Sequence, residues 1–275
     1  MSSEAPSTDP IKNVKRRDAV WISGVAATLS TMLGIGGGSV MVPLLGLVAK
    51  VPLKRAAGSS LVVIVIVVSI GLALKAQLSP EEIHWAVAGV LAGGAFVGAF
   101  IGRWLNTRLP EGVFKYAFCV LLLLVSLRMF GLGMQSGSAI FYAIDMSRAS
   151  VWAVLGVVGL LAGITSAMFG IGGGIVFVPG MALVFGFFGE NFRAAGATSL
   201  AAMLPTVIVG SILHYRARNI DKRLVLTMLP LSIVGAATGI FLASEVDKAV
   251  LKKVFATLVI MAAVRLSLQK NSSKK

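Results

Sequence analysis

The chain has 275 residues, of which 57% are hydrophobic and 13% are charged, and its formal net charge is +14 at pH 7. Soluble domains carry roughly 25% charged residues, so this composition excludes an ordinary water-soluble fold and indicates a membrane protein. The basic residues stand singly or in short groups beside apolar stretches, a distribution typical of membrane orientation signals and not of nucleic-acid binding.

Residues 1–18 form a polar tail that ends in Lys12, Lys15, Arg16 and Arg17. A signal peptide is not indicated, because the apolar stretch that follows continues over residues 19–49 without a small-residue cleavage site. The basic cluster instead predicts that the N-terminus lies in the cytoplasm.

Apolar stretches long enough to cross about 30 Å of hydrocarbon recur along the chain. They cover residues 56–77, 83–106, 111–130, 149–168, 194–215, 223–244 and 249–268. Most of the chain is therefore embedded in the bilayer, which leaves no room for a soluble catalytic domain. Gly94, Gly98 and Gly102, spaced four residues apart, predict a close helix–helix contact.

Two glycine-rich tracts interrupt apolar stretches, GIGGGSVMVP at 34–43 and GIGGGIVFVP at 170–179. Glycine and proline are the residues least compatible with a continuous helix. Broken backbone at membrane depth is tolerated only where it is buried in protein or lines a cavity. Paired breaks in the two halves of a chain therefore predict a transport site near the bilayer midplane. Close helix packing is the alternative, but it does not require consecutive glycines followed by a proline.

The tracts belong to a longer internal duplication. The motif RAAG at 55–58 recurs at 193–196, and Ser-Ser-Leu at 59–61 corresponds to Thr-Ser-Leu at 198–200. The predicted divisions are a cytoplasmic tail at 1–18, a first transmembrane repeat at 19–130, a linker at 131–148, a second repeat at 149–268 and a cytoplasmic tail at 269–275.

The distribution of Lys and Arg distinguishes two topologies. If each tract is the tip of a hairpin that returns to its own side, eighteen of the 25 basic residues are cytoplasmic, against fifteen if each tract lies in a single span. Hairpins give the stronger positive-inside bias. We therefore expect an all-α polytopic bundle of two inverted repeats, each with a glycine-broken helix or hairpin followed by three spans. If the arms of each hairpin are themselves full spans, the chain crosses the membrane ten times, and each loop stays on the same side as in the hairpin topology.

The residues near the breaks suit a small anion. A helix that begins near Ser39 or Ile175 presents free N–H groups and the positive end of its dipole, which bind oxyanions without a charged side chain. Nearby hydroxyls can donate further hydrogen bonds, namely Thr31, Ser39, Ser59, Ser60, Thr165, Ser166, Thr198 and Ser199. No acidic residue falls in the middle of an apolar stretch to bind a cation, which favours an anionic substrate.

The duplicated tract, RAAG and the Ser/Thr-Ser-Leu motif together resemble the sulfite exporter TauE/SafE family from about Asp18 to Leu268. The resemblance implies a multi-pass protein of the cytoplasmic (inner) membrane that moves sulfite or an organosulfonate such as sulfoacetate. It assigns substrate binding to Gly36, Gly37, Gly38, Ser39, Ser59, Ser60, Gly172, Gly173, Gly174, Thr198 and Ser199. Ile175 stands where the first repeat has Ser39, so the second break is expected to contribute backbone only.

We therefore expect a secondary transporter that works by alternating access. Arg55 and Arg193 either attract anions to the site or anchor span ends at the lipid headgroups. The alternative function is a passive anion channel that uses the same breaks as a filter. We expect no enzyme activity, cofactor, metal or nucleic-acid partner. The expected partners are the small anion and the lipid bilayer, with a homodimer, the substrate's identity and the direction of transport left open.

Overall fold

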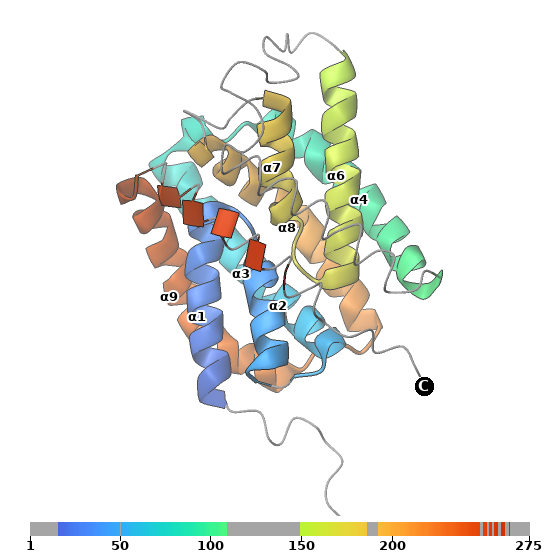
Figure 1. Ribbon diagram of the computed structural model, residues 1–275, viewed down its shortest axis with the longest axis vertical. Coiled ribbons are helices and arrows are strands. Elements are labelled where there is room, and N and C mark those ends of the chain that lie inside the picture. The colour runs from blue at the N-terminus through green and yellow to red at the C-terminus, as the bar shows by residue number, and fades with distance from the viewer. Residues whose placement is uncertain are drawn as a thin grey trace, which may run out of the picture.

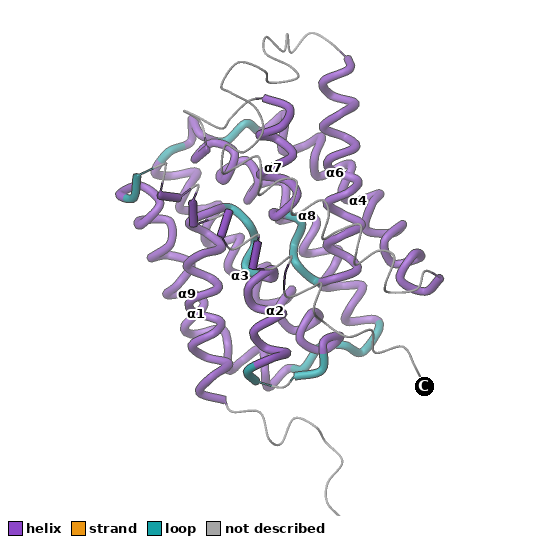
Figure 2. Tube along the Cα trace, in the orientation of Figure 1, coloured by secondary structure: helices purple, strands orange, loops and turns teal. Residues whose placement is uncertain are grey.

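The computed structural model describes residues 16–49, 51–108, 149–185 and 192–247, with scattered residues between 250 and 264. These ranges contain helices and connections and no strands (Figure 2). The helices are α1 (Arg16–Leu33), α2 (Gly38–Leu47), α3 (Leu53–Leu78), the short 3₁₀ helix η1 (Pro80–Glu82), α4 (Trp85–Arg108), α6 (Ala149–Phe169), α7 (Gly174–Phe185), α8 (Phe192–Arg216) and α9 (Lys222–Glu245). The expected span 111–130 lies outside the described residues, as does much of 249–268.

Five of these helices are long and apolar enough to cross a membrane: α3, α4, α6, α8 and α9. They coincide with five of the apolar stretches expected from the sequence. Large apolar side chains such as Trp85, Phe96 and Phe241 are about half exposed on the outer surface. In a membrane protein such side chains face the acyl chains, so the helical bundle is built for a bilayer.

Both glycine tracts end one helix and begin another. Gly34 and Gly170 adopt φ angles of +69° and +70°, the left-handed conformation in which a glycine commonly terminates a helix. Beyond them, Gly36, Gly37, Gly172 and Gly173 also have positive φ angles. A residue with a side chain is strained in this region, so the repeated glycines dictate where α1 and α6 stop.

The two broken segments approach one another from opposite ends of the bundle. In Figure 1, α1 rises from the lower end and α2 returns toward it, whereas α6 descends from the upper end and α7 returns upward. Their turns lie at about the same height, in the middle of the molecule. Each tract thus lies at the tip of a hairpin within the described structure.

The first helix of each half of the chain packs against the last described long helix of the other half. Helix α1 packs along α9 and α6 packs along α4, while α3 and α8 cross between them. At the α4–α6 contact, a Cβ atom on Gly98 would lie 2.9 Å from the carbonyl carbon of Leu160, and one on Gly102 would lie 2.6 Å from the carbonyl oxygen of Ile164. Gly94 lies equally close to the backbone of α6. The predicted glycine contact is therefore confirmed, because it lets two helix backbones touch.

Candidate functional site

The two glycine breaks touch each other, backbone against backbone. A Cβ atom on Gly38 would lie 2.6 Å from the carbonyl oxygen of Gly170, and one on Gly174 would lie 2.7 Å from the carbonyl oxygen of Gly34. Real Cβ contacts are longer than this, so neither position accepts a side chain without moving the other break. The sequence prediction brought these glycines to one site, and the structure places them in contact.

Several backbone N–H groups at the breaks have no acceptor among the described residues. The carbonyl of Gly37 accepts from the N–H groups of Val40 and Met41, and the N–H of Ser39 has no backbone acceptor among the described residues. In the second break, the carbonyl of Gly173 likewise accepts from Val176 and Phe177. Within the described residues, further N–H groups without a backbone or side-chain acceptor are those of Gly36, Gly37, Gly172, Gly173, Gly174 and Ile175. These uncovered donors and the helix dipoles of α2 and α7 favour negative charge.

Three buried hydroxyl groups near the breaks also lack partners within the described structure. Ser30, Ser39 and Ser166 are 0%, 7% and 1% exposed, and their Oγ atoms make no hydrogen bond. The Oγ of Ser30 lies 3.3 Å from the position that a Cβ atom on Gly37 would take, so it faces the first break. A buried hydroxyl without a partner costs about 1–3 kcal/mol, which a hydrogen bond to a bound polar group would offset.

Ser30 was not among the residues selected from the sequence. Ser30 and Ser166 each precede the first glycine of their own tract by four residues. That repeated spacing was the available signal. Both residues lie in the last turn of a helix, where a hydroxyl ordinarily bonds to its own backbone, and only the structure shows that these two do not.

The other predicted hydroxyls are engaged with backbone groups. Ser199 Oγ donates to the carbonyl of Gly34 over 2.7 Å, which ties α8 to the first break. Ser59 Oγ accepts from the N–H of Asp221 at the start of α9, and Thr198 Oγ1 accepts from the N–H of His84 at the start of α4. Ser60 Oγ donates within α3, to the carbonyl of Ala57. Of these four hydroxyls, that of Ser199 is bonded to a break.

Apolar side chains fill the space where the breaks cross. The Sδ atom of Met203, a fully buried residue of α8, lies 2.6 Å from the Cβ position of Gly174, and its methyl group contacts Gly36. From α3, the Cδ1 atom of Ile64 lies 2.9 Å from the Cβ position of Gly38. The crossing point is closed in this structure, and the flexible thioether of methionine is well suited to a place that must repack.

The two breaks differ in what covers them. At Gly173 the ring of Phe177 takes the place that Ser30 takes at Gly37, with its Cε2 atom 3.1 Å from the Cβ position of the glycine. Ile175 replaces the hydroxyl of Ser39. The place beside Gly37 is therefore polar, whereas the equivalent place beside Gly173 is apolar, and Ser166 is the buried hydroxyl without a partner that precedes the second break.

Arginine occupies the first turn of both α3 and α8. Arg193 donates to the carbonyls of Ser244 and Val246 over 2.8 and 3.0 Å, which ties the start of α8 to the end of α9. Arg55 lies half-buried at the start of α3. Among the described residues, no group of three or more His, Cys, Asp or Glu side chains is placed to hold a metal ion.

Known proteins that are similar to this chain are described as exporters or membrane transporters. The family model for the sulfite exporter TauE/SafE matches residues 2–129 and 155–275. The chain is similar to "Probable membrane transporter protein MJ0441" of Methanocaldococcus jannaschii, at 31% identity over 39% of this chain and 42% of that protein. It is also similar to two proteins of Bacillus subtilis with the same description, YdhB (25% identity, 80% of this chain and 87% of that protein) and YunE (26%, 78% and 84%). No solved structure matches the chain. The family match covers most of the sequence and both glycine tracts, and the chain accordingly belongs to the sulfite exporter TauE/SafE family of multi-pass membrane transporters.

Proposed function

We propose that this transporter is a secondary carrier for a small sulfur-containing anion, sulfite or an organosulfonate such as sulfoacetate. The observation that carries the proposal is the meeting of two helix breaks whose N–H groups and buried hydroxyls lack partners. The acidic residues that the structure describes lie at helix ends or in connections, so none of them opposes an anion at the breaks. The family name supplies the sulfur chemistry, and the donor-rich breaks suit a sulfite or sulfonate group.

We infer that the two halves are inverted repeats in the cytoplasmic membrane, with both termini in the cytoplasm. The opposed hairpins of Figure 1 and the equivalent pairs α1–α9 and α6–α4 support the inversion. The excess of Lys and Arg on one side supports the orientation. The anion site then lies near the midplane, where the two turns meet.

Transport proceeds by alternating access in this proposal. The closed crossing supports a carrier over a channel, because Met203 and Ile64 fill the place that an open pore would leave free. Release of the anion to either side requires the breaks to separate. A passive channel is the competing function, and it conducts without such a cycle.

Counterflow in proteoliposomes separates these two functions. Vesicles loaded with unlabelled sulfite or sulfoacetate are expected to accumulate the labelled anion transiently, and the initial rate is expected to saturate with concentration. Unitary currents in planar bilayers together with unsaturated flux would instead establish a channel. Absence of counterflow and of current with both anions would remove the proposed substrate class.

The hydroxyls of the first break are expected to bind the anion directly. In the double variant Ser30→Ala/Ser39→Ala, the Kd for sulfoacetate should rise at least about 10-fold, because a hydrogen bond to a charged group contributes about 1.5–3 kcal/mol. The melting temperature without ligand should stay the same or rise, since the lost hydroxyls had no partners. Ser232→Ala is the control, because Ser232 is equally buried but bonds the carbonyl of Met228 within α9. Unchanged binding in the double variant would place the anion elsewhere.

A further inference from the structure

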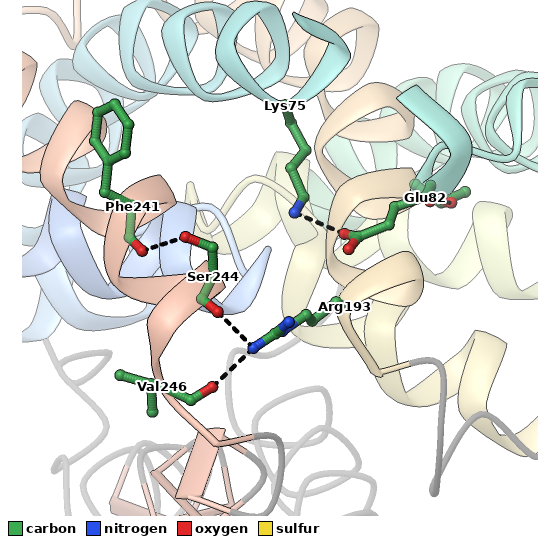
Figure 3. Close-up of polar contacts among 7 residues, drawn as sticks. Lys75, Glu82, Arg193, Phe241, Ser244 and Val246 are labelled. Carbon is green, nitrogen blue, oxygen red and sulfur yellow. Dashed lines mark hydrogen bonds and ion pairs between the residues drawn. The ribbon is translucent and has the colours of Figure 1, made fainter. Parts of the chain in front are cut away.

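A buried lysine lies at the end of the bundle where α3 finishes. Lys75 stands in the last turn of α3 and is 6% exposed. Its Nζ atom lies 2.6 Å from Oε2 of Glu82, which belongs to η1 (Figure 3). The side chain of Glu82 is 23% exposed, although the Oε2 atom that pairs with Lys75 is itself buried.

A second cation borders the same region. Arg193, in the first turn of α8, extends toward the end of α9 in Figure 3 and donates there to two carbonyl oxygens. Its Nε atom is buried and has no hydrogen-bond partner among the described residues. The guanidinium is thus held in place with donor capacity unused.

Lys75 and Arg193 line one small cavity. Its volume is about 10 Å³, which is room for about one water molecule. Thr31, Leu33 and Gly196 also line it. The backbone of Gly196 lies against Gly34, the first glycine of the first break, whose Cβ atom would come 2.5 Å from the Cα atom of Gly196. The cavity therefore borders the first break from one end of the bundle.

We propose that Lys75 and Arg193 form an entry site for an oxyanion, and that the carboxylate of Glu82 occupies this site when no anion is bound. The entry site is separate from the glycine breaks and rests on the proposed function only for the claim that the bound oxyanion is the transported one. An arriving sulfite, sulfate or sulfonate takes over the ion pair with Lys75, and Glu82 turns toward solvent.

The energetics of a buried ion pair favour such an exchange. A buried pair contributes little net stability, because desolvation offsets the attraction, but a buried lysine left alone is costly. An incoming anion keeps Lys75 paired and returns Glu82 to water, so the number of buried charged groups is unchanged. The carbonyl end of α3 also favours the ammonium group at this place.

The second half of the chain does not repeat the Lys75–Glu82 ion pair. His214 follows Thr198 by sixteen residues, as Lys75 follows Ser59, and Asn219 precedes Asp221 by two residues, as Glu82 precedes His84. Histidine and asparagine do not reproduce the lysine–carboxylate pair. The lysine–carboxylate pair of the first half is therefore not repeated at the equivalent described positions of the second half.

The test compares Glu82→Gln with Glu81→Gln in the full-length protein. Both variants remove one negative charge from η1, but Glu81 is exposed and makes no contact with Lys75 in the described structure. Apparent Kd values for sulfate, sulfite and sulfoacetate are measured by thermal shift at constant ionic strength in detergent. If Glu82 occupies the site about nine-tenths of the time, its removal lowers the Kd about 10-fold, whereas Glu81→Gln leaves it unchanged. Equal Kd values in the two variants, or no shift with any of the three anions, would overturn the entry site.

Three further backgrounds complete the test. The gain in affinity of about 10-fold should vanish in Glu82→Gln/Lys75→Gln, in which the charges of the pair are again balanced. It should persist in Glu82→Gln/Lys75→Arg, which keeps the cation. It should also persist when Gly38→Ala blocks the breaks. If the gain in affinity disappears with Gly38→Ala, the entry site is not separate, and binding at the breaks remains supported. If the gain in affinity is present but no background shows counterflow, the proposed carrier function is refuted and the entry site remains supported.

Discussion

Replacing Gly38 or Gly174 by alanine is expected to reduce the initial rate of sulfite counterflow by at least about 10-fold, since displacements below 1 Å are enough to disable a binding site. The added methyl group would lie 2.6 Å from backbone atoms of the opposite break, Gly170 in one case and Ile35 in the other. The two breaks must then move apart, and their N–H groups no longer converge on one anion. Counterflow in proteoliposomes measures the loss.

Gly93→Ala and Gly156→Ala are the matched controls. A methyl group at either position meets nothing within 4 Å, and both lie in spanning helices, α4 and α6. They should transport at the wild-type rate. Full activity of Gly38→Ala and Gly174→Ala would show that the anion does not pass between the breaks.

The second large effect is expected on stability. Gly98→Ile should lower the melting temperature by about 5 °C or more, because overpacking costs about 1–3 kcal/mol and each kcal/mol shifts a protein of this size by about 2–4 °C. The new side chain would have to enter the backbone of α6, where a Cβ atom already lies 2.9 Å from the carbonyl carbon of Leu160 and 3.0 Å from the nitrogen of Ile164. Thermal unfolding of the purified protein in detergent measures the change.

Gly93→Ile tests whether the position or the residue type is responsible. Gly93 lies on the same helix, α4, but faces outward with open space around it. Its replacement should leave the melting temperature nearly unchanged. If both variants melt alike, the contact between α4 and α6 does not depend on the missing side chain of Gly98.

Hydropathy and glycine content predicted much of this fold. The stretches 56–77 and 223–244 match α3 and α9 to within a few residues, because a span in lipid needs a long apolar run. The ends of α1 and α6 follow from glycines that alone tolerate positive φ angles. These features depend on local sequence, which is why they can be read from it.

The site was less predictable at the level of single side chains. Lys75 and Glu82 look like solvent-side charges in any hydropathy window, and only the packing of α3, η1 and α8 buries the lysine. Ser59 and Thr198 repeat in the sequence because each hydroxyl holds the start of a helix from the other half. Repetition marks structural contacts as readily as binding contacts, so it does not separate the two.

The exchange of first helices constrains how the molecule can deform. Helices α1 and α9 form one closely packed pair, and α4 and α6 form another, so each pair takes one member from each half. Separating the first half of the chain from the second would break both helix–helix contacts at once. In a large motion, each of the two helix pairs would therefore move as a rigid body. The turns at Gly34–Gly37 and Gly170–Gly173 would act as the hinges.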